Sequence, residues 1–90
     1  MGTALIQLKI MPESPDSNLE EIQAKAEETI KQNHGDNPKF ETKPVAFGLN
    51  SIIASFSIDE SYPTDPFETE VSKIEGISSA EITDFRRAFG

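Results

Sequence analysis

Hydrophobic and polar residues alternate along the first part of the chain. Between Thr3 and Met11, one side carries Ile6, Leu8 and Ile10, and the other carries Gln7 and Lys9. A period of two residues is typical of a β-strand with one buried face. Pro12 and Pro15 lack a backbone donor and prevent the ladder from continuing. The pattern therefore predicts a strand over Thr3–Met11 that ends at the prolines.

The next segment repeats its apolar residues at intervals of three and four. These residues are Leu19, Ile22, Ala26 and Ile30, and charged side chains fill most of the remaining positions. Such spacing forms one apolar stripe along an α-helix. Ser17 or Asn18 can cap its start, and Gly35 is the expected glycine cap beyond its end near Asn33. We expect an amphipathic helix here.

Two further stretches alternate as the first one does. Lys39–Lys43 is short and is followed by Pro44, which suits a strand at the edge of a sheet. Leu49–Ile58 alternates over a longer span, and it is expected to be the longest strand and a central one. Its inward residues are Ile52, Ala54, Phe56 and Ile58, and its outward residues include Ser55 and Ser57.

The last third of the chain predicts a second helix and a final strand. Thr64 and Pro66 favour a helix start, and Phe67, Val71 and Ile74 recur at helical spacing. We expect about three helical turns that end at Gly76. Ser78–Phe85 is then predicted to be a strand, followed by a basic tail that contains Arg86 and Arg87.

The resulting element order is β-α-β-β-α-β. It predicts an α+β fold of the ferredoxin-like kind, in which a four-stranded antiparallel sheet carries both helices on one face. A chain of 90 residues supports one core of modest depth, so residues 1–90 are expected to form a single domain. Because one fold hosts many functions, this architecture does not identify an activity.

The charge of the chain narrows the classes of partner. Sixteen acidic and eight basic residues give a formal net charge of −8, which repels nucleic acids and anionic membranes. The N-terminus has neither the basic region of a signal peptide nor an unbroken apolar span, so a cytoplasmic protein is expected. The charge fits either a steered encounter with a basic protein surface or solubility alone.

Motifs for covalent chemistry and metal binding are missing from the sequence. There is no cysteine and one histidine, and no phosphate-binding glycine loop is present. His34 is expected to be a solvated loop residue. The acidic cluster of Asp59, Glu60, Asp65 and Glu68 does not follow the calcium-loop spacing. We therefore expect no enzyme, no metal and no cofactor.

Two features remain without a structural explanation. Phe47 stands beside Gly48 in a loop, where an aromatic ring either closes the core or anchors a partner. Arg86 and Arg87 are adjacent cations near the end of an acidic chain, and they form either a solvated terminus or a contact. The residues themselves leave both alternatives open.

Three blocks of the chain together resemble archaeal elongation factor 1-beta. They are Lys-Ile-Met-Pro-Glu-Ser-Pro-Asp at 9–16, Pro-Val-Ala-Phe-Gly-Leu at 44–49, and the ending 74–87. The match runs nearly end to end. It implies the ferredoxin-like fold and an exchange factor that binds the GDP form of elongation factor 1-alpha and expels the nucleotide. A monomer is expected when the protein is free.

The resemblance also implies which residues contact the GTPase. Phe47 matches an aromatic ring that packs against the GTPase in longer eukaryotic relatives, although Ala46 replaces the first glycine of their Pro-x-Gly-aromatic-Gly segment. Arg87, or alternatively Arg86, matches a lysine that reaches toward the magnesium and phosphate region, and arginine carries a planar fork instead of a compact charge. The expected set is Phe47, Gly48 and Phe85 for binding and Arg86 and Arg87 for exchange.

Two other functions share the element order. A regulatory domain of the ACT type pairs with a second copy to sense a small molecule, and a ligand-dependent dimer would favour this alternative. An acylphosphatase needs an arginine in a phosphate loop after the first strand, and Met11–Asp16 contains none. The ACT-like function is therefore the alternative that stays open at this point.

Overall fold

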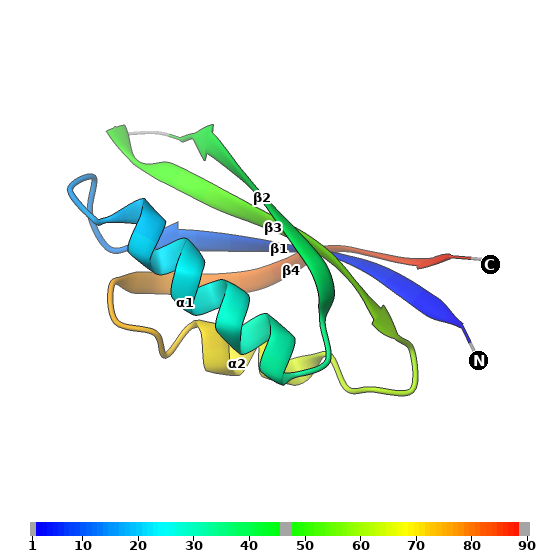
Figure 1. Ribbon diagram of the computed structural model, residues 1–90. Helices are drawn as coiled ribbons and strands as arrows, with labels where there is room; N and C mark the ends of the chain where they lie inside the picture. Colours follow the sequence, from blue (N-terminus) through cyan, green and yellow to red (C-terminus); the bar gives the residue numbers. More distant parts are fainter. Residues whose placement is uncertain (1, 46–47, 89–90) are drawn as a thin grey trace.

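Six elements follow one another in the predicted order in the computed structural model, which describes residues 2–45 and 48–88. They are β1 (Thr3–Pro12), α1 (Leu19–Gln32), β2 (Asp36–Pro44), β3 (Asn50–Asp59), α2 (Asp65–Val71) and β4 (Ile77–Ala88). The strands form one antiparallel sheet in the order β2-β3-β1-β4, and both helices cover the same face (Figure 1). The ferredoxin-like prediction is confirmed.

The core lies between the sheet and the two helices. The strands contribute Ala4, Ile6, Leu8, Ile10, Ile52, Ala54, Phe56, Ile58 and Ile77, and the helices contribute Ile22, Ala26, Ile30, Phe67 and Val71. The alternation predicted for the two central strands is thus confirmed, because their inward positions are the buried ones. The rings of Phe56 and Phe67 lie 4.7 Å apart at a tilt of 56°, which joins β3 to α2.

Helix α1 ends at a left-handed residue that is not glycine. Asn18 caps its start as predicted, since its side chain accepts the N–H of Glu21 at 3.1 Å. At the other end His34 adopts a φ of 73°, so the predicted cap at Gly35 is wrong. Glycine is required at position 35 because there is no room for a side chain. A Cβ there would overlap Cγ2 of Ile30 and lie 2.9 Å from the Ile30 carbonyl oxygen.

His34 has a contact that the sequence did not indicate. Its ring stacks on that of Tyr62, with 3.9 Å between the ring centroids and 10° between the ring planes. The residue is exposed, as predicted for a loop histidine. The stack links the end of α1 to the turn between β3 and α2, two segments that no strand pairing connects.

Three lengths differ from the predictions. The longest strand is β4, with 12 residues, and not β3, with 10. Helix α2 has seven residues, about two turns instead of three, and Ile74 packs against the core from the turn that follows the helix. The edge strand β2 extends over Asp36–Pro44 instead of Lys39–Lys43, although its place at the edge is confirmed.

We expect Gly35→Ala to destabilise the fold, because the added methyl group would displace Ile30 from the core. Overpacking of this kind costs about 1–3 kcal/mol. Chemical denaturation would show the loss as a lower midpoint. Ser78→Ala, at an exposed position of β4, is the control and should stay within about 0.5 kcal/mol. Equal midpoints for the two variants would contradict the steric role of Gly35.

Candidate functional site

Arg86 and Arg87 belong to strand β4 and not to a free tail. Arg86 pairs with Leu5 of β1, and Arg87 pairs with Ala4. The prediction that the strand ends at Phe85 is therefore wrong. The strand continues beyond Phe85 because β1 extends to Thr3 and offers backbone partners to the last residues of β4. Both arginine side chains consequently start from a hydrogen-bonded backbone.

A bulge interrupts the pairing between β4 and β1. Gln7 lies opposite Asp84, while Leu8 lies opposite Ile82, so Thr83 is the extra residue. The Thr83 hydroxyl donates to the Gln7 carbonyl at 3.5 Å. A bulge of this kind leaves one residue unpaired and resets which face the following side chains occupy.

The two arginines lie on opposite faces of the sheet, as adjacent strand residues do, and the bulge determines which face each one occupies. Beyond it, Arg86 shares the open face with Leu5, its partner across the ladder, while Phe85 and Arg87 turn to the helix side. The ends of β1 and β4 extend past the helices (Figure 1), and there Phe85 is 46% exposed. One flat partner surface cannot contact both guanidinium groups through the same face.

Among the residues that the structure describes, each arginine has one weak ionic partner. Nε of Arg86 lies 2.9 Å from Oδ2 of Asp84 on the same strand, and Nε of Arg87 lies 3.5 Å from Oε2 of Glu60 in the turn after β3. The arginine side chains are 76% and 71% exposed. Exposed ion pairs contribute about 0–1 kcal/mol. A partner's anionic groups can therefore compete for either arginine.

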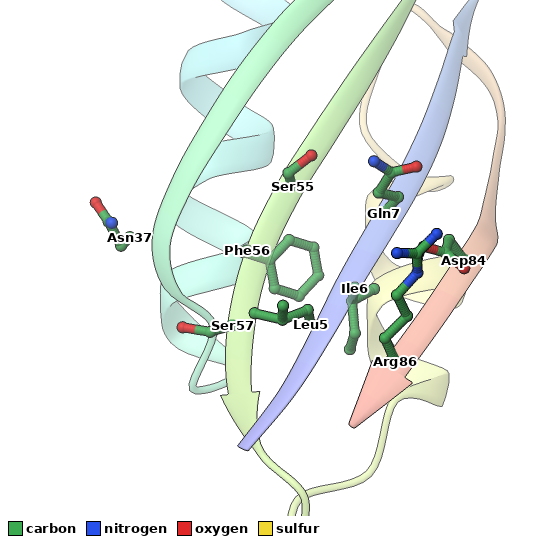
Figure 2. A pocket seen from close by; sticks show the side chains of 9 residues that line it. All are labelled: Leu5, Ile6, Gln7, Asn37, Ser55, Phe56, Ser57, Asp84 and Arg86. Carbon is green, nitrogen blue, oxygen red and sulfur yellow. The ribbon is translucent and has the colours of Figure 1, made fainter. Parts of the chain in front are cut away.

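A groove of about 400 Å³ lies on the open face of the sheet. The outward side chains that line it are Leu5 and Gln7 of β1, Asn37 of β2, Ser55 and Ser57 of β3, and Asp84 and Arg86 of β4. Figure 2 shows Arg86 beside Asp84 on the β4 side of this groove and the two serines on the β3 side. The outward positions predicted for Gln7, Ser55 and Ser57 are confirmed.

Leu5 is the residue of this groove that sequence reasoning missed. It is 48% exposed and is one of three large hydrophobic side chains that the described residues expose, the others being Tyr62 and Phe85. Its signal was present in the alternation, since Leu5 occupies an outward position of β1 while Ile6 occupies an inward one. An apolar residue at an outward strand position is a candidate contact.

The two halves of the predicted contact set lie at opposite ends of the sheet. Phe47 falls outside the described residues, but Gly48 follows β2 in the loop that leads to β3, with a φ of 75° that favours glycine. Arg86 lies beside Leu5, which pairs with Ser57 near the other end of β3. The eight strand residues from Asn50 to Ser57 span roughly 23 Å. One small recess cannot hold both halves.

The acidic cluster predicted around Asp59 does not converge on one point. Glu60 faces Arg87, and Glu68 faces β4. The Ser61 backbone N–H donates to Asp59 at 2.9 Å and lowers the pKa of that carboxyl below its ordinary value of 3.8. This stabilising contribution is present above the ordinary pKa and is lost as the pH falls through the lowered one. Within the described residues no metal-binding group of three or more His, Cys, Asp or Glu was found.

None of the helices in the described part of the chain is long and apolar enough to cross a membrane.

The open sheet face, with its groove and with Arg86 at its edge, defines a small ferredoxin-like interaction domain. Residues 5–88 match the model of the EF-1 guanine nucleotide exchange domain. Elongation factor 1-beta of Methanothermobacter thermautotrophicus is 36% identical over 88 residues, which cover 97% of this chain and 98% of that protein. Elongation factor 1-beta of Nanoarchaeum equitans is 40% identical over 82 residues, 90% of this chain and all of that protein. The chain therefore belongs to the EF-1 guanine nucleotide exchange domain family.

This membership confirms the resemblance carried by the three sequence blocks. The chain is a guanine-nucleotide exchange factor of translation elongation that acts on elongation factor 1-alpha, and it is not a catalytic enzyme. The ACT-like alternative is set aside on the same ground, because the match covers nearly the whole chain. The roles of single residues are a separate question.

Glu68 of α2 holds β4 immediately before the bulge. Its Oε2 accepts the backbone N–H of Ile82 at 2.8 Å, in a partly buried position. We expect Glu68→Ala to cost about 1–2 kcal/mol, since a charged acceptor is lost from a backbone donor. Hydrogen exchange at the Ile82 amide should accelerate about tenfold, as measured by NMR.

Glu70→Ala is the matched control for Glu68→Ala, because Glu70 is an exposed glutamate of the same helix. It should leave the exchange of the Ile82 amide unchanged. If both variants accelerated that exchange equally, the effect would belong to the charge of α2 and not to the hydrogen bond.

Proposed function

We propose that this chain releases GDP from elongation factor 1-alpha through two contacts at opposite ends of its sheet. Phe47 and Gly48 form an anchoring contact at one end, and Phe85 with the arginines forms the exchange-promoting contact at the other. The observation that supports the second contact most directly is that Arg86 and Arg87 extend from a paired strand and remain largely exposed. The backbone of such a cation is already ordered, so binding restricts only its side chain.

Exchange of this kind needs no covalent step. A factor that binds the nucleotide-free GTPase more tightly than the GDP form weakens GDP binding by the same ratio, because the two equilibria are linked. A hundredfold weakening corresponds to about 2.8 kcal/mol. A few well-placed contacts supply a free energy of that size.

Arg86 is the better candidate for the magnesium and phosphate region. It lies on the open face beside the exposed Leu5, and its partner Asp84 belongs to the same strand. Arg87 is on the side of the helices and pairs with Glu60. The helix segments 19–32 and 65–76 carry a net charge of −5, so the helix side is the less suitable approach to an anionic nucleotide site.

The remaining features of the proposal follow from its partner. The factor acts in the cytoplasm, as a monomer when free, and it binds both the GDP-bound and the nucleotide-free GTPase. Its net charge of −8 disfavours direct contact with nucleic acid or with an anionic membrane.

Release of a fluorescent GDP analogue from elongation factor 1-alpha of the same organism tests the function. In the presence of magnesium and excess unlabelled nucleotide, the protein should accelerate release at catalytic concentrations. Heat-denatured protein is the control. An unchanged release rate with both proteins folded would refute exchange activity for this pair.

We expect Arg86→Ala to lower the maximal release rate about tenfold, since a charge-assisted contact to an anionic group is worth about 1.5–3 kcal/mol. Arg87→Ala should have a smaller effect. The measurement is release rate against factor concentration, which separates the maximal rate from the half-saturating concentration. Lys73→Ala removes an exposed cation after α2 and is the control. A larger loss for Arg87→Ala would reverse the assignment.

A further inference from the structure

The open face of the sheet has an uncharged centre and a charged rim. On the two central strands, the outward positions from Leu5 to Met11 and from Ser51 to Ser57 carry one charge, that of Lys9. The edge strands carry the other charges of this face, which are Asp36, Lys39, Glu41 and Lys43 on β2 and Glu81, Asp84 and Arg86 on β4. Both signs occur on each edge.

This distribution is that of a protein-binding surface. Interfaces between proteins have a centre depleted in charged residues, with polar and charged side chains around it. Leu5 supplies an exposed apolar group on the central strand β1, and Gln7 and Ser55 supply neutral hydrogen-bonding groups beside it. None of these three carries a charge that a partner would have to desolvate.

The helix layer has the opposite character. Residues 19–32 and 65–76 hold eight acidic and three basic side chains, a net charge of −5, whereas the four strands hold five of each and are neutral. Most of the net charge of −8 therefore lies on the layer that covers the other face. A surface that approaches a bound nucleotide diphosphate should not be anionic.

The open face is large enough to bind another protein. Strands of nine to twelve residues, spaced about 4.8 Å apart, give a face of roughly 500 Å². A stable complex buries about 800 Å² on each partner. The open face supplies most of that area, and the loops at its two ends can supply the rest.

We infer that the open face of the sheet is the surface on which elongation factor 1-alpha docks, while the acidic helix layer points away from the GTPase. This inference rests on the proposed function and names the surface that carries it. The GTPase covers the groove around Leu5 and Gln7, and Arg86 enters from the rim. The acidic helix layer then orients the encounter without contacting the nucleotide site.

A matched pair of substitutions tests this assignment. Gln7→Glu places one carboxylate at the centre of the open face, and Gln23→Glu makes the same chemical change on α1. Binding of each full-length variant to nucleotide-free elongation factor 1-alpha is measured by titration calorimetry. We expect Gln7→Glu to weaken binding tenfold or more, because the new charge is buried against the partner. Gln23→Glu should stay within twofold of the natural chain.

Leu5→Ala tests the same face without a change of charge, and it should weaken binding to the GTPase several-fold. Leu5 and Gln7 are both exposed, so thermal unfolding should show that the variants remain folded. Equal effects of Gln7→Glu and Gln23→Glu, or a larger effect of Gln23→Glu, would overturn the assignment. Normal GDP release by the natural chain with unaffected binding of Gln7→Glu would overturn this inference and leave the exchange function standing.

A second copy of the chain is the competing occupant of the open face. Light scattering of the free protein is expected to give a monomer for the natural chain and for Gln7→Glu. A dimer that Gln7→Glu dissociates, together with unweakened binding of the GTPase, would show that the face joins two copies and would overturn the inference. Absence of any binding to nucleotide-free GTPase would overturn both this inference and the proposed function.

Discussion

The pairing of β4 with β1 is the constraint on which the rest of the molecule depends. Strand β1 is central and pairs on both sides, with β3 along one edge and with β4 along the other. Because β1 continues to Thr3, β4 continues to Ala88. A segment that would otherwise be a solvated terminus thereby becomes ordered backbone. The groove, the facing of the arginines and the separation of the two contact regions all follow from this pairing.

The two faces of the sheet serve different physical purposes. One face buries the apolar side chains of both helices and supplies the hydrophobic stabilisation. The other face contributes little to the core, so its side chains are free to differ without loss of the fold. The charge follows the same division, with the acidic residues concentrated on the helices. Function can therefore be placed on the open face at little cost in stability.

Most of the fold could be predicted from the chain, because its periodicities are regular. Alternation at Ile6–Ile10 and at Ile52–Ile58 identified the buried faces of both central strands, and three- and four-residue spacing identified α1. The errors arose where tertiary contacts override local signals. Gly35 is selected by contact with Ile30 and not by a left-handed φ, and Ile74 packs from a turn. No local pattern records either contact.

The candidate site was less accessible to prediction than the fold. The resemblance pointed to Phe47 and to the two arginines, and alternation placed Gln7 and the serines on the outward side. The sequence could not predict which face of the sheet Arg86 and Arg87 occupy. That face depends on the bulge at Thr83, which is defined by pairing with a strand distant in the sequence. The alternation of β1 placed Leu5 outward, but its place in a groove depends on neighbouring strands that the sequence does not identify.

Because side chains alternate between the two faces along β4, it matters whether the number of residues after the bulge changes by an odd or an even number. Any change of one residue between Asp84 and Arg86 would exchange the faces of both arginines, whereas a change of two would restore them. Removal of Thr83 alone would straighten the ladder and keep every later side chain on its present side. The spacing within this short segment is thus constrained more tightly than the identity of its residues.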